Sequence, residues 1–245
     1  MGQAKNIEIK PISASDARAI IKKFHYSGKV VQNSQLHFGA FLNGRCHGAM
    51  QFGPSMDKKK MMTLVRGTKW SNFIELNRMA FGPQLPKNSE SRALSVAFRL
   101  IKRKYPQIKW VVSFSDATQC GCGSIYRASG FRLVGIKQNS SLIRLPDGSV
   151  KSRMTLDEEP IKKSSWWKKN GATPLKGYQI KYVKFLDESW VDRLTVPVIP
   201  FSKIKELGAS MYLGQCVSSD TSDTPAFHAG KSGATPTDTL QKGGD

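Results

Sequence analysis

The sequence contains few cysteines and no long apolar run. Four cysteines occur among 245 residues, and their number and uneven spacing argue against a disulfide framework or a four-thiolate zinc site. No segment approaches the roughly 18–20 consecutive apolar residues that a membrane span needs, and the first ten residues lack the hydrophobic region of a secretory signal. We therefore expect neither a membrane protein nor a secreted one, and we predict a reducing, cytoplasmic location.

Acidic residues are also scarce. The chain has 38 Lys and Arg against 18 Asp and Glu, which gives a formal net charge of +20. The last forty residues hold two basic and five acidic side chains, so residues 1–205 keep 36 basic against 13 acidic ones, a net charge of +23. A folded body with this charge favours a polyanionic partner, because phosphate backbones neutralise it and release counterions. A basic protein without such a partner is the alternative.

Apolar periodicity and turn signals predict an α/β fold with a mixed central sheet flanked by helices. Strands are expected at Ile7–Ile12, Leu36–Leu42, Arg45–Phe52, Phe73–Phe81, Lys109–Ser115, Phe131–Ile136 and Tyr178–Leu186. Helices are expected at Ser13–Phe24, Ser91–Tyr105 and Gly123–Ser129, and a second hairpin at Leu142–Leu145 and Val150–Thr155. We divide the chain into a core (1–155), a basic aromatic C-terminal extension that completes the sheet and a DNA-binding surface (156–213), and a disordered tail (214–245).

A candidate phosphate-binding segment precedes the long helix. It consists of Lys87, Asn88, Ser89, Glu90, Ser91 and Arg92. The start of a helix exposes unpaired backbone N–H groups, and Lys87 and Arg92 add positive charge, so the segment can hold a pyrophosphate. The alternative is a helix capped by Asn88 or Ser89 and nothing more.

Polar residues stand at the end of the apolar strand Lys109–Ser115. The carboxyl end of a strand is where open α/β sheets bind their ligands, and here it carries Ser113, Phe114 and Asp116. Ser113 and Asp116 can accept hydrogen bonds from an exocyclic amine, and Phe114 can stack on a base. The alternative for Asp116 is that it caps the following turn.

Tyr126 lies on the short helix that follows. A short helix with a tyrosine, then glycine and a strand, is the pattern that closes many acyltransferases of the GNAT superfamily. In that superfamily the tyrosine lies near the coenzyme A sulfur and can protonate the departing thiolate, which suits a phenol with an ordinary pKa near 10. A half-buried core tyrosine is the alternative.

Two further groups of residues are candidates for binding. Cys120 and Cys122, with Asp116 close by in the sequence, leave an iron or zinc site open, to which His25 could contribute. Lysines and indoles suit nucleotides, because they neutralise phosphates and stack on bases, and a solvated loop with a packed indole is the alternative. The candidate nucleic-acid contacts of this kind are Trp166, Trp167, Lys168 and Lys169.

Five motifs occur together in one order along the chain. They are His25-Tyr26-Ser27-Gly28, Glu75-Leu76-Asn77-Arg78, Lys87-Asn88-Ser89-Glu90-Ser91-Arg92-Ala93-Leu94, Ser113-Phe114-Ser115-Asp116 and Ile125-Tyr126-Arg127-Ala128-Ser129-Gly130-Phe131. From about Ile9 to Lys203 the sequence resembles the Mom family of DNA-modification proteins from Mu-like bacteriophages, a divergent branch of the GNAT-like enzymes.

This resemblance implies conversion of adenine to N6-carbamoylmethyladenine in double-stranded DNA, which hides phage DNA from the restriction enzymes of the host. It implies a GNAT-like fold, acetyl-CoA or another acyl-CoA as cofactor, and action in the cytoplasm of the host cell. The segment from Asn88 to Arg92 would hold the coenzyme pyrophosphate. The residues implied at the reactive centre are Arg78, Ser91, Ser113, Asp116 and Tyr126. Those implied to face the DNA are His25, Tyr26 and Phe114. The target base must be flipped out, because its N6 is inaccessible while the base is stacked.

Several alternatives stay open. Simple transfer from acetyl-CoA would give an amide, whereas a carbamoylmethyl group is joined through its methylene carbon, so a glycine-derived donor or a metal-assisted rearrangement is needed. A conventional N-acetyltransferase and a phage DNA-binding protein without enzymatic activity are the competing functions. A homodimer is also left open.

Overall fold

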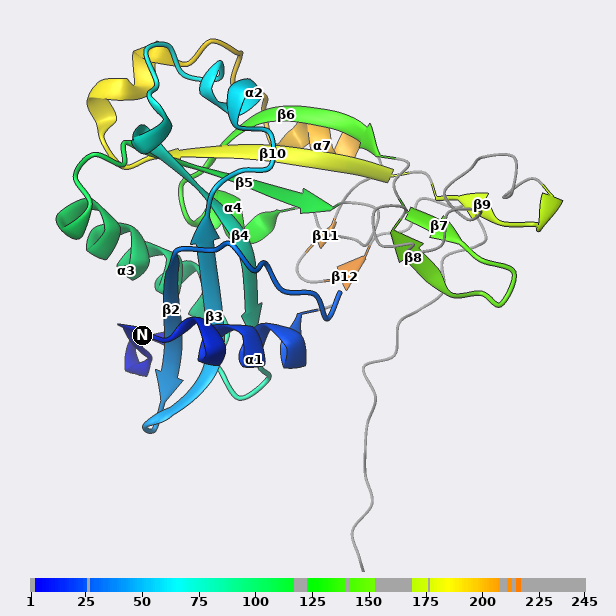
Figure 1. The fold of residues 1–245 in the computed structure, drawn as a ribbon, viewed down its shortest axis with the longest axis horizontal. Helices are drawn as coiled ribbons and strands as arrows, with labels where there is room; N and C mark the ends of the chain where they lie inside the picture. Colours follow the sequence, from blue (N-terminus) through cyan, green and yellow to red (C-terminus); the bar gives the residue numbers. More distant parts are fainter. Residues whose placement is uncertain are drawn as a thin grey trace, which may run out of the picture.

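The computed structural model describes residues 3–25, 27–116, 123–139, 142–152, 169–175, 177–207, 211–212 and 215–216, with the backbone alone at 139, 151–152, 211–212 and 215–216. A seven-stranded mixed sheet forms its centre (Figure 1). In spatial order the strands are β1 (Glu8–Pro11), β2 (Leu36–Leu42), β3 (Arg45–Gly53), β4 (Phe73–Phe81), β5 (Trp110–Asp116), β10 (Gly177–Phe185) and β6 (Arg132–Asn139). All neighbours are antiparallel except β4 and β5. The predicted α/β fold with a mixed central sheet is confirmed.

Helices and smaller strand pairs surround this sheet. The α-helices are α1 (Ala14–Phe24), α2 (Lys58–Met62), α3 (Ser89–Lys104), α4 (Ser124–Ala128) and α7 (Ser202–Glu206), and the 3-10 helices are η1 (Gln3–Asn6), η2 (Trp70–Asn72) and η5 (Glu188–Arg193). Strands β8 (Val150–Ser152), β7 (Leu142–Arg144) and β9 (Thr173–Pro174) form one small sheet, and β11 (Met211–Tyr212) pairs with β12 (Gln215–Cys216). Within the described residues, no helix has the length and apolar character that crossing a membrane requires.

Local signals explain the elements of the N-terminal half. Ser13 caps α1 through its Oγ, which accepts a hydrogen bond from the N–H of Asp16 at 3.1 Å. Asn43 and Gly44 both have positive φ, 49° and 76°, as the tight turn between β2 and β3 demands. The sequence did not predict the short helices α2 and α7. Met211 of β11 pairs with Cys216 of β12, and Tyr212 pairs with Gln215.

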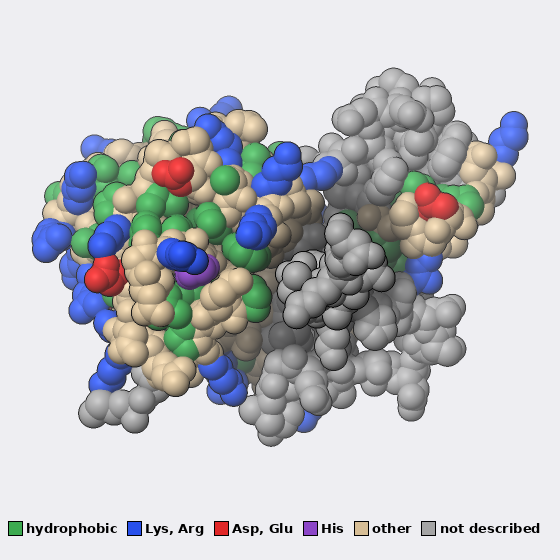
Figure 2. All heavy atoms as spheres, turned by 90° about the horizontal axis from the view of Figure 1, so that it is seen from below, with side chains coloured by type: hydrophobic (Ala, Val, Ile, Leu, Met, Phe, Trp, Pro, Cys, Tyr) green, Lys and Arg blue, Asp and Glu red, His purple; other side chains and the backbone are tan. Residues whose placement is uncertain are grey.

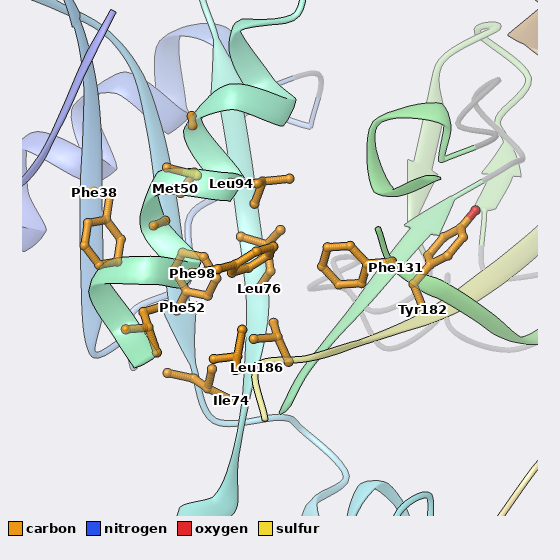
Figure 3. Close-up of a cluster of buried hydrophobic side chains, with 14 of the residues drawn as sticks. Phe38, Met50, Phe52, Ile74, Leu76, Leu94, Phe98, Phe131, Tyr182 and Leu186 are labelled. Carbon is orange, nitrogen blue, oxygen red and sulfur yellow. The ribbon is translucent and has the colours of Figure 1, made fainter. Parts of the chain in front are cut away.

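Alternating side chains on the strands build cores on both faces of the sheet. On one face, helix α3 places Leu94 and Phe98 over Phe52 and Leu76, with Phe131 alongside (Figure 3). We call this the α3 face. On the opposite face, α1 packs on alanines of β3 and β4, and farther along the sheet α2 and η5 cover an aromatic cluster. We call this the α1 face.

A bulge in β4 decides which side chains of this strand share a face. Gln51 of β3 pairs with Arg78, and the next residue of β3 pairs with Leu76, so Asn77 is the extra residue. Leu76 and Met79 consequently both pack under α3, although they are an odd number of residues apart. Arg78 points to the α1 face as a result. The sequence did not predict this bulge, and a strict alternation would have put Arg78 on the other side.

Strands β4 and β5 are paired over only part of their length. Their parallel ladder runs from Phe73 with Trp110 to Leu76 with Ser113, and beyond that point the two strands diverge (Figure 1). Strand β10, far along the sequence, lies between β5 and β6 and pairs with both. The divergence therefore lies in the middle of the sheet, where its position depends on strands from distant parts of the chain.

Candidate active site

The start of α3 has the geometry of an anion-binding site. Asn88 precedes the helix with φ of 70° and makes no side-chain capping bond. The N–H of Ser89 is bonded to Pro86 O and that of Arg92 to Asn88 O, whereas those of Glu90 and Ser91 have no acceptor among the described residues. A left-handed residue followed by helical ones turns such N–H groups toward one point and forms a concave anion-binding nest. These donors fit a pyrophosphate.

Side chains of this segment divide into two groups. Lys87, Asn88 and Arg92 are exposed. Ser89 is buried, and its Oγ donates a hydrogen bond of 2.6 Å to Pro86 O, so this residue stabilises the loop with its side chain. Ser91 donates to Asn88 O at 3.2 Å. Backbone N–H groups and two positive side chains are therefore what the segment offers to a ligand.

The end of β5 lies at the divergence from β4. Ser113 is fully buried, and its Oγ donates to Leu76 O at 3.3 Å, across the last pair of the parallel ladder. Asp116 is the final residue of the strand and pairs with Gln179, whereas the sequence placed it just after the strand. Alternation along β5 turns Phe114 and Asp116 to the α1 face and Ser113 and Ser115 to the α3 face.

Tyr126 lies on the α3 face of the sheet, near the end of β5. Its Oη donates a hydrogen bond of 3.4 Å to the carbonyl of Phe114, on the edge of β5 that β4 leaves. Its ring stacks on the fully buried ring of Tyr182, with centroids 4.8 Å apart. Asp116 and Tyr126 thus lie on opposite faces of the sheet, both near the end of β5.

The loop after α1 covers Arg78. The Nε–H of Arg78 donates to Lys29 O at 3.3 Å and its Nη1 to Asn77 O at 2.7 Å. Burial, and then the positive charge of Arg78, lower the pKa of His25 to about 4, so its ring is neutral at pH 7. The N–H of Ser27 donates to His25 Nδ1 at 3.2 Å, which assigns the ring proton to Nε2. A neutral donor of this kind suits the edge of a base better than a phosphate.

This pKa predicts an effect on stability. Because the folded pKa of His25 lies below its unfolded value of about 6.5, the unfolded state binds the proton first, and stability that is present above pH 6.5 is lost as the pH falls toward 4. Lowering the pH from 7 to 4 should cost the wild-type protein about 3 kcal/mol more than the variant His25→Asn. Urea unfolding of both proteins at a series of pH values measures this difference. Parallel pH profiles would contradict the assignment.

Residues that the sequence did not single out hold this loop. Gln51 is fully buried in β3; its Oε1 accepts from the N–H of Val31 at 3.4 Å, and its Nε2 donates to Ser34 Oγ at 3.0 Å. Ser34 Oγ lies 2.8 Å from His37 Nε2. A polar residue inside an otherwise apolar strand was the available signal. Gln51 thus positions the segment that carries His25.

A half-buried carboxyl group, that of Glu75, lies beside the bulge. Burial raises the pKa of Glu75, while hydrogen bonds from Ser55 and Asn77 and the charge of Arg78 act in the opposite direction. Asn77 donates to Pro54 O at 3.4 Å. Glu75, before the bulge, and Asn77, the bulge residue, are thus both bonded to the segment that follows β3.

Several predicted site residues lie outside the described part of the chain, namely Tyr26, Cys120, Cys122, Trp166, Trp167 and Lys168. Lys169 is described and exposed. Within the described residues, no three His, Cys, Asp or Glu side chains come together as a metal site would require. His25 and Asp116 therefore do not belong to a complete ligand set within the described part of the chain.

The strand order, the diverging parallel pair and the open start of α3 characterise this mixed α/β fold. Among solved structures, the fold is similar to that of Arabidopsis thaliana NAA60 in complex with a bisubstrate analogue, with 13% identity, a TM-score of 0.48, and coverage of 73% of this chain and 97% of that one. It is also similar to a GNAT family acetyltransferase from Elizabethkingia anophelis with acetyl-CoA bound, with 15% identity, a TM-score of 0.40, and coverage of 74% and 98%.

Sequence comparison then identifies the family. Residues 6–203 match the model of the Mom protein family. The chain is 34% identical over 198 residues to the methylcarbamoylase mom of Escherichia phage Mu, an alignment that covers 78% of this chain and 80% of that protein. The chain belongs to the Mom protein family, as the order of its five motifs predicted.

Proposed function

We propose that this protein transfers a carbamoylmethyl group to N6 of adenine in double-stranded DNA and so protects phage DNA from restriction. Its family membership supports the class of reaction, since the relative from phage Mu is a methylcarbamoylase. The observation that carries the proposal is the divergence of β4 and β5, where Tyr126 is bonded to Phe114 of β5 and β4 leads into the open start of α3.

In this proposal, the α3 face of the sheet binds the coenzyme and the α1 face binds the target base. On the α3 face, the N–H groups of Glu90 and Ser91, with Lys87 and Arg92, would hold the pyrophosphate of an acyl-CoA. The bound coenzyme would supply an activated acyl group and release its thiol. Because direct attack of N6 on a thioester gives only an amide, a glycine-derived donor would supply the methylene carbon that becomes joined to N6. On the α1 face, the loop that carries His25 would receive the flipped adenine, because it covers Arg78 on the same side as Phe114 and Asp116.

The residues at the divergence manage protons and orientation. Asp116 can take the proton that N6 loses when this nitrogen gains a carbon substituent, and Phe114 offers a ring against which the base can stack. Tyr126 holds a proton on Oη at the edge of β5, where it can be given to a departing sulfur. Arg78, fixed by two backbone carbonyls, contributes a positive charge beside the base.

Mass spectrometry of nucleosides tests the proposal directly. DNA from cells that express the protein should contain adenine heavier by one carbamoylmethyl substituent attached at N6. An N-acetyl adenine would instead identify the conventional acetyltransferase, and unmodified DNA, with the protein bound to it, would favour a DNA-binding protein without enzymatic activity.

The coenzyme site makes a separate prediction. Ser91→Glu places a carboxylate at the open N–H groups of α3, so coenzyme A should no longer raise the melting temperature of the variant. Its melting temperature without ligand should be unchanged or higher, because a negative charge in the first turn of a helix is favourable. Ser95→Glu, an exposed position one turn later in α3, is the matched control and should keep the thermal shift. If Ser91→Glu keeps it as well, the pyrophosphate binds elsewhere.

A further inference from the structure

An exposed methionine stands beside the candidate active site. Met56 is 85% exposed, the highest value among the large apolar side chains of the described residues that remain exposed. It follows β3 and precedes α2, in the segment Pro54–Asp57. Methionine is unbranched and polarizable, so it adapts well to irregular apolar surfaces of a partner.

The backbone on both sides of Met56 is fixed. Pro54 O accepts from Asn77 Nδ2 at 3.4 Å, and Ser55 is buried and bonded to the carboxyl group of Glu75. On the other side, Asp57 caps α2, because its Oδ1 accepts from the N–H of Lys60 at 3.1 Å. The exposed side chain is therefore presented on a rigid base.

The position of Met56 is close to the reacting groups. Asn77, which anchors Pro54, is the bulge residue next to Arg78. A Cβ at Gly53 would lie 2.8 Å from Cα of Ser34 and 2.7 Å from Oδ1 of Asn77, so the segment also touches the loop that carries His25. Met56 thus belongs to a segment that is bonded to Glu75 and Asn77, which lie three residues and one residue before Arg78 in β4.

Lysines surround this methionine. Lys58, Lys59 and Lys60 of α2 are exposed, and Nζ of Lys58 lies 4.0 Å above the ring of Trp70. The pKa of Lys181 is lowered by burial and then by the charge of Lys60, with a smaller effect of the same sign from Lys137, while Asp57 acts in the opposite direction. Positive groups from α2, β10 and β6 are therefore near one another, and phosphates would relieve their repulsion. The side of the molecule away from α2, which Figure 2 shows from below, also carries more Lys and Arg than acidic side chains.

From this arrangement we infer that Met56 inserts into the base stack of DNA at the target step and fills the space that the extruded adenine leaves, while the lysines of α2 bind the flanking phosphates. An apolar wedge between positive side chains is how proteins unstack a duplex from its groove. This inference rests on the proposed function for the identity of the extruded base, but the insertion itself does not depend on the chemistry.

Comparison of duplex and single-stranded substrates tests whether Met56 acts as a wedge, that is, whether it inserts into the base stack. The substrate is a plasmid, used either as duplex or after heat denaturation. The full-length protein acts on it in cell extract, which supplies the donor. Modified adenine is then measured by mass spectrometry. Met56→Ala should lower the ratio of duplex to single-strand modification at least tenfold, because the single strand has no paired stack to open. Met56→Leu, which restores an apolar side chain of similar volume, should recover most of the ratio. A ratio that Met56→Ala does not change overturns the inference.

Base unstacking can also be measured without modification. In a pool of duplexes that carry one 2-aminopurine between randomised bases, saturating wild-type protein should raise the fluorescence, and Met56→Ala should reduce that rise at least threefold. Absence of a rise with the wild-type protein overturns the inference. A rise without any modified adenine in either plasmid form leaves the wedge supported and rejects the proposed function instead.

The phosphate contacts have their own readout. The double variant Lys59→Gln, Lys60→Gln should reduce the slope of log affinity against log salt for duplex DNA by about one to two units. Lys102→Gln with Arg103→Gln, at the end of α3 on the other face, removes the same charge and should change the slope less. Equal slopes for the two double variants would overturn this part of the inference.

Discussion

Asp116→Asn is expected to lower adenine modification by about 10²–10⁴-fold, the usual contribution of a positioned general base. The amide has nearly the volume of the carboxylate, but it cannot take the proton that N6 loses. Asp116 ends β5 with its side chain on the α1 face, so the substitution leaves the ladder to Gln179 intact. Nucleoside mass spectrometry measures the product, and melting temperature and DNA affinity should remain close to wild type. Normal modification by this variant would remove Asp116 from the mechanism.

Tyr126→Phe should produce a loss of the same order, because only the hydroxyl that holds the transferable proton is removed. The ring stacked on Tyr182 is kept, so folding should be preserved. Tyr178→Phe, at a half-buried position of β10, is the matched control for loss of one phenol group. A loss of melting temperature in Tyr126→Phe would assign the hydroxyl to packing, through its bond to Phe114 O, instead of to chemistry.

Gly123→Ala is expected to destabilise the protein by about 2–5 kcal/mol, from the strain of a left-handed residue and from overpacking. Gly123 has φ of 70°, and a Cβ there would lie 2.0 Å from Oη and 2.4 Å from Cζ of Tyr182. Tyr182 is fully buried and stacked on both Tyr126 and Phe201, so its ring has little freedom to move.

Gly148→Ala separates these two contributions. Gly148 has φ of 79° and nothing within 4 Å of its added Cβ, so only the backbone strain applies. Gly148→Ala should therefore lower the free energy of unfolding by less than Gly123→Ala does, by about 1–2 kcal/mol. Chemical denaturation of both variants gives the comparison, and equal losses would show that the contact with Tyr182 relaxes without penalty. A shift of α4 in Gly123→Ala should also reduce modification, since this helix carries Tyr126.

Local chemistry explains what the sequence by itself determined. The β2–β3 hairpin, the Ser13 cap, the strand Phe73–Phe81 and the helix after Asn88 depend on residues close together in the chain, and each was found at or near its predicted place. Family membership was also readable, because five short motifs in one order are a specific pattern. The predicted positions of Asp116 and Tyr126, at the end of one strand and on the next helix, follow from the same local patterns.

Only the tertiary structure decided on which face of the sheet these residues lie and which residues are their neighbours. The bulge at Asn77 turns Arg78 to the α1 face, and it arises from pairing with β3, not from any local signal. Asp116 and Tyr126 lie on opposite faces because β5 alternates while α4 packs against α3. Met56 looks like an ordinary loop residue until Asn77, Glu75 and α2 fix its backbone beside the site. Long-range pairing sets these relations, and no pattern along the chain records it.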